Sequence, residues 1–184
     1  PQPSPKNKEK KEWTSIIFAD QIQENKEAFL AKLTQVAQEL TVDPNWLMLI
    51  MKKESWLDAK IQNKDTQATW LIQFMPETAK GLGTTVAQLK TMSNVEQLDY
   101  VKKYYQQSQF ANKIHSYGDL YLATFYPAAL GKEGSFVLWW QDVAQKNPWV
   151  NLNKDGKITK DEFDQYIKNT IKESVSSEYQ QNFA

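Results

Sequence analysis

One carboxylate and one amide stand in apolar surroundings in this chain. Glu54 ends a strongly apolar segment, and Gln73 lies within a second apolar segment that stops at Met75 and Pro76. A carboxyl group at the edge of an apolar cleft is a candidate general acid, because loss of hydration raises its pKa towards neutral pH. The stretch Lys53–Ala79 therefore predicts a site for acid–base chemistry.

A second set of polar residues, Asn151–Glu162, has the spacing of the twelve-residue calcium loop of an EF-hand. Alternate residues of such a loop point inwards and offer oxygen to a hard cation. Positions one, three, five, seven (through its main-chain carbonyl), nine and twelve are Asn151, Asn153, Asp155, Lys157, Thr159 and Glu162.

Gly156 and Ile158 fill the sharp turn and the apolar position of this loop. Among the ligand side chains only Asp155 and Glu162 supply negative charge, so the predicted calcium affinity is low, and a structural clip is favoured over a sensor. The alternative is a helix-turn element in which the asparagines and the glycine only shape the chain.

The composition excludes several other functions. Among 184 residues, 22 basic side chains balance 22 acidic ones, which argues against non-specific nucleic-acid binding. The chain has no cysteine, and no nucleophile triad can be assigned around its one histidine, His115. No apolar run approaches the roughly 18 residues of a membrane span. We therefore expect no nucleic acid, no membrane span and no organic cofactor.

The elements that must position these residues are almost all helical, and the predicted fold class is all-α with little or no sheet. Asp43-Pro44 starts a helix that is apolar on all faces and should be central, and Ser93–Glu96 is a capping box. Helices are expected over 29–40, 44–55, 76–82, 85–89, 95–105, 117–130, 135–146 and 160–172.

Three regions are expected along the chain. Residues 1–12 are rich in proline and lysine and predict a disordered arm. Residues 13–147 should form the main helical domain, and residues 148–184 an EF-hand-like helix-loop-helix with a tail. The start at Pro1 rather than Met is typical of a trimmed leader or upstream region.

The helical part of the chain resembles the lysozyme-like soluble lytic transglycosylase family, over about residues 43–131. The resemblance is carried by Glu54-Ser55 at a helix end, by a Leu-Ile-Gln-Phe-Met-Pro block around Gln73, and by Phe125-Tyr126-Pro127-Ala128-Ala129. The blocks LIQFMP, GLGTT and FYPAALGK resemble those of bacteroidete and phage members. A cell envelope, periplasmic, secreted or phage-associated location is what this resemblance implies.

The resemblance also implies a mechanism. Glu54 would protonate the glycosidic oxygen between N-acetylmuramic acid and N-acetylglucosamine in peptidoglycan. It would then act as base on the muramoyl 6-hydroxyl, which closes an anhydro ring; muramidase hydrolysis is a close variant. Ser55, Gln73 and Tyr126 would orient Glu54 and the sugar N-acetyl groups. No second carboxylate is assignable by pattern, since Asp58 and Asp65 lie in or near a polar loop.

The sequence departs from the family at two glycines. The family block Gly-Ala-x-Gly reads Gln67-Ala68-Thr69-Trp70 here, and position 56, often small in relatives, is Trp56. A ring at position 70 would block a sugar subsite or provide a stacking platform for it. The alternative function is therefore a catalytically impaired or engineered module that binds cell-wall glycan or self-associates through Trp70 and Trp56.

Overall fold

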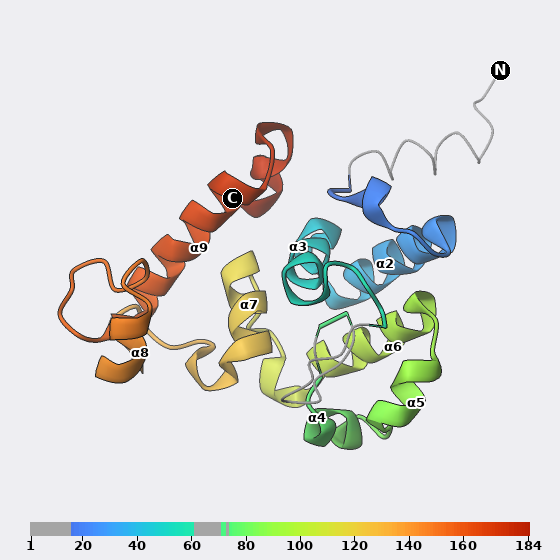
Figure 1. Ribbon diagram of the computed structural model, residues 1–184, viewed down its shortest axis with the longest axis horizontal. Coiled ribbons are helices and arrows are strands. Elements are labelled where there is room, and N and C mark those ends of the chain that lie inside the picture. Colours follow the sequence, from blue (N-terminus) through green and yellow to red (C-terminus); the bar gives the residue numbers. More distant parts are fainter. Residues whose placement is uncertain (1–15, 61–70, 73) are drawn as a thin grey trace. The chain divides into compact units, whose positions relative to one another are not determined.

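The chain divides into two compact units, Pro1–Gln109 and Phe110–Ala184 (Figure 1). The computed structural model describes residues 16–60, 71–72 and 74–184. The arm expected over residues 1–12 lies outside this part of the chain. The domain boundary expected between residues 147 and 148 stays a prediction, because compact packing units and sequence domains need not coincide.

The first unit is built mainly from helices in its described residues. Its α-helices are α2 (Lys26–Leu40), α3 (Pro44–Ser55), α4 (Pro76–Gly81), α5 (Val86–Thr91) and α6 (Asn94–Tyr105), and one 3-10 turn, Ala19–Gln21, precedes them. Helix α2 packs against both α3 and α6 (Figure 1). The helices of the first unit thus surround a core to which α3 contributes most continuously.

Helix α3 is the buried central helix that its sequence predicts. Asp43 caps it by accepting the N–H of Asn45 (2.8 Å), and Pro44 takes the first helical position, where its missing donor costs nothing. All five residues from Leu47 to Met51 are buried. Burial on every face fixes the direction of this helix and therefore the place of its last residues.

The start signals of the other helices in this unit are also confirmed. Pro76 is the first residue of α4, and the Thr85 hydroxyl accepts the N–H of Gln88 at the start of α5. Ser93 and Glu96 form the predicted reciprocal capping box of α6, which satisfies two N–H groups that a helix start leaves unpaired.

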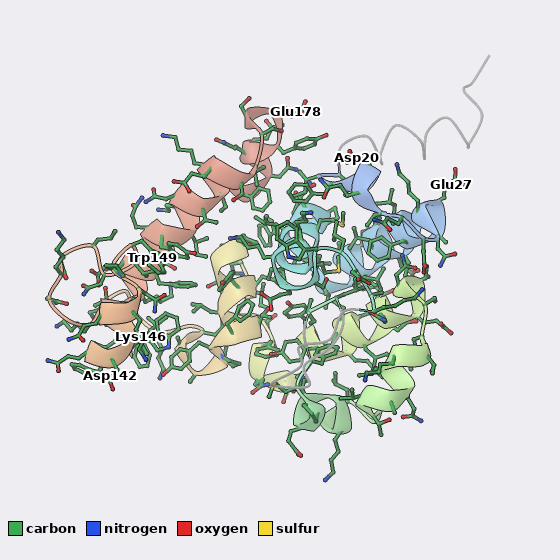
Figure 2. All side chains as sticks on the ribbon, viewed as in Figure 1. Asp20, Glu27, Asp142, Lys146, Trp149 and Glu178 are labelled. Carbon is green, nitrogen blue, oxygen red and sulfur yellow. The ribbon has the colours of Figure 1, made fainter. Side chains whose placement is uncertain are left out.

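The second unit holds three α-helices and a small sheet in its described residues. They are α7 (Tyr117–Phe125), β1 (Val137–Trp139), α8 (Gln141–Lys146), β2 (Ile158–Thr159) and α9 (Lys160–Ser174), with 3-10 turns at Pro127–Ala129 and Ser177–Phe183. A further 3-10 turn, Ser108–Phe110, includes the last residues of the first unit and the first residue of the second. Figure 2 shows Asp142 and Lys146 on α8 and Trp149 just after it. The short α8 and the long α9 flank the segment with calcium-loop spacing.

The predicted helix over Ser135–Lys146 is wrong in its first half. Val137–Trp139 is a strand that pairs antiparallel with β2, with Val137 opposite Thr159 and Trp139 opposite Ile158. Leu138 is buried and its two neighbours are half-buried, which is the alternation of a strand rather than a helix. Branched and aromatic side chains suit this pleated surface, and the helix begins only at Gln141.

The helix expected over Tyr117–Leu130, with an interruption at Pro127, ends at Phe125. Pro127 disfavours helical geometry at the residue before it, and Tyr126 accordingly has φ −146° and ψ 67°. Apart from the small two-stranded sheet, the described residues are mostly helical, so the all-α prediction is confirmed. In the described ranges, no helix combines the length and apolar character that crossing a bilayer requires.

Candidate active site

Glu54 lies in the last turn of α3, where the buried helix reaches the surface. Burial raises the pKa of its carboxyl group from 4.5 to about 7, and the neighbouring positive charge of Lys53 partly opposes this. The carbonyl end of a helix also disfavours a negative charge, which acts in the same direction as burial. A group with a pKa near 7 can both give and take a proton near neutral pH.

Ser55 joins the end of α3 to the second apolar segment. Its side chain is fully buried, and its hydroxyl lies 2.9 Å from the carbonyl oxygen of Met51 and 3.1 Å from that of Leu71. Leu71 and Ile72 are buried beside it. The hydroxyl therefore holds the segment that leads into Gln73 against the helix end that carries Glu54.

Gln73 and Trp70 lie outside the described residues, as do Gln67 and Asp65. The residues on either side of Gln73, Ile72 and Phe74, are both buried. The ring of Phe74 packs against Tyr104 of α6, with 5.5 Å between centroids. Ile72 and Phe74 themselves are thus held by core contacts.

The helix carrying Glu54 ends in an unusual backbone. Trp56 and Leu57 follow Ser55 with φ angles of 56° and 66°, in the left-handed region that favours glycine. The N–H of Trp56 still donates to the carbonyl of Lys52 (3.1 Å), so the left-handed turn closes the helix. Two consecutive residues of this kind next to the candidate acid are a local strain of the sort that clusters at functional sites.

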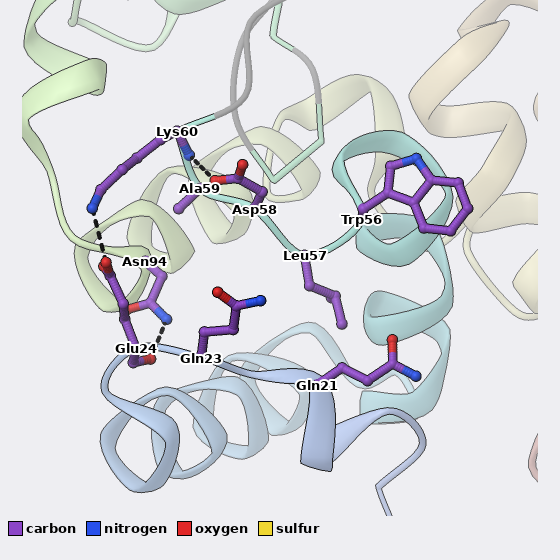
Figure 3. Close-up of a pocket in the computed structure, with 9 residues that line it drawn as sticks. All are labelled: Gln21, Gln23, Glu24, Trp56, Leu57, Asp58, Ala59, Lys60 and Asn94. Carbon is purple, nitrogen blue, oxygen red and sulfur yellow. Dashed lines mark hydrogen bonds and ion pairs between the residues drawn. The ribbon is translucent and has the colours of Figure 1, made fainter.

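Trp56 is among the most exposed large side chains described. Its side chain is 71% accessible, and the Lys52 ammonium lies 4.6 Å from the ring centroid. The ring stands at one side of an open pocket of about 130 Å³, directed away from Glu24 and Lys60 (Figure 3).

This pocket is built by polar contacts that follow Glu54 in the chain. Lys60 pairs with Glu24 (2.8 Å), and the Asp58 carboxylate accepts the N–H of Lys60 (2.8 Å; Figure 3). Glu54 is not among the residues that line it. We therefore do not assign this pocket as the substrate cleft of Glu54, although residues that follow Glu54 in the chain line it.

Tyr126 belongs to the second unit, where it follows the end of α7. It is half-buried, and its ring lies 5.6 Å from the ring of Trp139 on β1, tilted by 41°. Trp139 in turn meets the ring of Phe163 on α9 at 6.1 Å. The tyrosine is thus supported by the sheet and by the last long helix.

The predicted calcium ligands lie in one loop between α8 and α9. The Asn153 side chain accepts the N–H of Asp155 (2.9 Å), and the Asp155 side chain accepts the N–H of Lys157 (3.0 Å). Thr159 caps α9 in a reciprocal capping box with Glu162. In the described residues, no group of three or more His, Cys, Asp or Glu side chains is placed to hold a metal, and two of the six predicted ligand positions are asparagine.

Two groups that act on the candidate site are absent from the residues predicted for it. Lys53 acts on the Glu54 pKa, and its place next to Glu54 in the chain was a visible signal. The Leu71 carbonyl is the other, and no sequence pattern marks a main-chain acceptor.

Comparison with known families adds one finding. Residues 32–116 match the family described as the transglycosylase SLT domain. The matched range contains Glu54, Ser55 and Gln73, and it ends before Tyr126 and the loop Asn151–Glu162. No curated protein and no solved structure shows significant similarity to the chain.

Proposed function

Because residues 32–116 belong to the lysozyme-like transglycosylase SLT family, we propose that this protein cleaves the glycan strands of peptidoglycan. The bond cut is the glycosidic bond between N-acetylmuramic acid and N-acetylglucosamine. The observation that carries the proposal is the Glu54 carboxyl group, whose pKa burial raises to about 7 at the end of the central helix.

In the first step, protonated Glu54 gives its proton to the glycosidic oxygen. The bond from the muramoyl C1 to that oxygen breaks, and N-acetylglucosamine leaves with the new hydroxyl group. A pKa near the working pH keeps a large fraction of Glu54 protonated before the step and makes it a competent base afterwards.

In the second step, the Glu54 carboxylate takes the proton of the muramoyl 6-hydroxyl. The oxygen of that hydroxyl forms a bond to C1, which closes the 1,6-anhydro ring and restores protonated Glu54. One carboxyl group thus serves in both steps. The described residues support a single catalytic carboxyl group, because Asp58, the carboxylate that follows Glu54 in the chain, is exposed and lines a pocket that Glu54 does not line.

Ser55 acts as a positioning residue in this proposal. Its buried hydroxyl ties the helix end to Leu71, so it fixes Glu54 relative to the segment that carries Gln73. Gln73 and Tyr126 are proposed to bind the sugar N-acetyl groups, and Trp70 to contact a sugar as a stacking platform. Because peptidoglycan lies outside the cytoplasm, we expect the protein to act in the cell envelope or periplasm, after secretion, or as part of a phage particle.

Product analysis by mass spectrometry tests the proposal. Purified peptidoglycan is incubated with the parent chain and with Glu54→Gln. Release of anhydro-muropeptides by the parent, and loss of at least about a hundredfold in the variant, is the expected result. Reducing-end muropeptides would instead indicate hydrolysis. Equal release by both proteins would remove Glu54 from the reaction.

A second candidate function is a non-catalytic module that binds glycan or itself. Trp56 favours it, because an aromatic side chain that is 71% exposed offers a surface for stacking on sugars or on a second copy. The discriminating result is retained sedimentation with peptidoglycan and no product release. Sizing chromatography of Trp56→Ser against the parent tests self-association, which an unchanged elution volume would rule out.

A further inference from the structure

We propose that Asn151–Glu162 is a calcium site of low affinity, and that the cation completes the coordination of a buried amide oxygen which the protein leaves without a hydrogen bond. The inference is independent of the proposed glycan cleavage. It concerns the second unit alone, and its readout is binding.

The main support for the calcium site is the buried side chain of Asn151, at position one of the loop. Its side chain is only 7% exposed, and no described group donates a hydrogen bond to its Oδ1. A buried amide oxygen without a partner costs about 1–3 kcal/mol, so such groups call for an explanation. In a calcium loop the oxygen at position one is a ligand of the cation, which supplies the missing partner.

Glu162, at position twelve, already closes the loop. Its carboxylate is nearly buried; one oxygen accepts the N–H of Asn153 (3.3 Å) and the other accepts the N–H of Thr159 (3.0 Å). These contacts draw position twelve towards positions three and nine. A bidentate carboxylate at this position is the strongest ligand that a loop of this kind has.

The main-chain conformation inside the loop is also compatible with a bound cation. The N–H groups of Asp155 and Lys157 point at the side chains two residues before them, and Gly156 takes φ +84° at the sharp turn. Carboxylate and amide oxygens have further lone pairs, so these hydrogen bonds leave room for a cation.

The charges of the loop predict weak binding. Among the six ligand positions only Asp155 and Glu162 carry a negative charge, and the Lys157 ammonium lies 3.7 Å from the Asp155 carboxylate. A dissociation constant on the order of 10⁻⁴ to 10⁻³ M is therefore expected, in the range of extracellular calcium modules.

Calorimetric titration of the full chain with calcium chloride is the direct test. We expect saturable binding of one ion and, at about 10 mM calcium, a rise of several degrees in the unfolding midpoint that excess chelator reverses. Magnesium at the same concentration should give a much smaller shift, because it keeps its water and its octahedral geometry. Trp149, two residues before Asn151, offers a fluorescence readout.

Two variants move the affinity in opposite directions. Asn151→Asp adds a negative charge at position one and should tighten binding on the order of tenfold, while lowering the unfolding midpoint in chelator because that charge is buried. Glu162→Gln should weaken binding at least about tenfold. Asp161→Asn is the matched control, since it removes the same charge beside Glu162 at a position that is not a ligand.

The proposal is overturned by any of three results. They are the absence of both heat and midpoint shift with calcium, an equal response to magnesium, and a loss of binding in Asp161→Asn as large as in Glu162→Gln. If Glu162→Gln does not fold, Asn151→Asp decides, and unchanged affinity in that variant counts against the site.

Discussion

The hydroxyl of Ser55 lies 3.1 Å from the carbonyl oxygen of Leu71, sixteen residues along the chain. Both side chains are buried, so this contact is shielded from water. It fixes the spacing between the end of the helix that carries Glu54 and the segment that leads into Gln73. The two halves of the sequence motif are therefore joined through a main-chain atom.

Removing this hydroxyl should loosen the site. Ser55→Ala leaves the buried Leu71 carbonyl without its donor, which should lower the free energy of unfolding by about 1–3 kcal/mol. We also expect kcat for product release to fall more than KM rises, since the carboxyl group is displaced while most sugar contacts stay. Denaturant unfolding and kinetics on peptidoglycan measure the two effects.

Thr34→Ala is the matched control for Ser55→Ala. The Thr34 hydroxyl also donates to the carbonyl four residues earlier, Leu30 (2.9 Å), but among the described residues it makes no hydrogen bond to a distant part of the chain. Its removal should cost clearly less than the removal of the Ser55 hydroxyl. Equal losses would mean that the Leu71 contact adds nothing.

The raised pKa of Glu54 predicts a pH-dependent stability. The folded pKa of about 7 exceeds the ordinary value of 4.5, so the folded state binds more protons than the unfolded state between these values. Stability should fall as pH rises through this window. Glu54→Gln should therefore be more stable than the parent by roughly 2–3 kcal/mol at about pH 8, and nearly equal to it at about pH 4.

Denaturant titrations of both proteins at the two pH values measure this difference. A gap between parent and Glu54→Gln that does not change with pH would contradict a raised pKa at position 54. Because no substrate is involved, the result is separate from the test of activity.

The charge of Lys53 should influence the pH above which activity is lost. Its proximity lowers the Glu54 pKa against the effect of burial, so Lys53→Gln should raise that pKa further. The alkaline limb of the pH–rate profile, expected near 7, should then move to higher pH. Lys80→Gln, on the exposed surface of α4, serves as the control and should leave the limb in place.

The left-handed backbone at Trp56 predicts a difference between two small substitutions. Glycine adopts φ 56° without the steric cost that a Cβ imposes, so Trp56→Gly should be more stable than Trp56→Ala by about 1 kcal/mol. Both variants lose the Lys52 contact equally, and the comparison therefore isolates the backbone. Thermal unfolding midpoints measure the stability difference between the two variants. A Trp56→Ala variant more stable than Trp56→Gly would contradict backbone strain at position 56.

Local signals in the sequence were sufficient for most helices. Asp43-Pro44, Pro76 and the Ser93–Glu96 capping box each start a helix where predicted, because a cap acts within one turn. The central place of α3 followed from its apolar residues on all faces. These features depend on neighbours in the chain, which a sequence displays directly.

Features that depend on distant partners could not be predicted. Val137–Trp139 becomes a strand because β2 lies beside it, and residues 158–159 are far along the chain. In the same way, Ser55 finds an acceptor at Leu71, and Asn151 is buried without one. The sequence marked Ser55 and Asn151 as site residues, but their surroundings are properties of the fold.

The two-stranded sheet has a practical consequence for shortening the chain. A protein cut after residue 147 would keep β1 but lose Ile158 and Thr159, the residues that pair with it. The N–H and C=O groups of β1 would then form an open strand edge next to the exposed Trp140, which is the kind of surface that promotes aggregation. Recombinant fragments of this protein should therefore retain residues up to at least the end of α9.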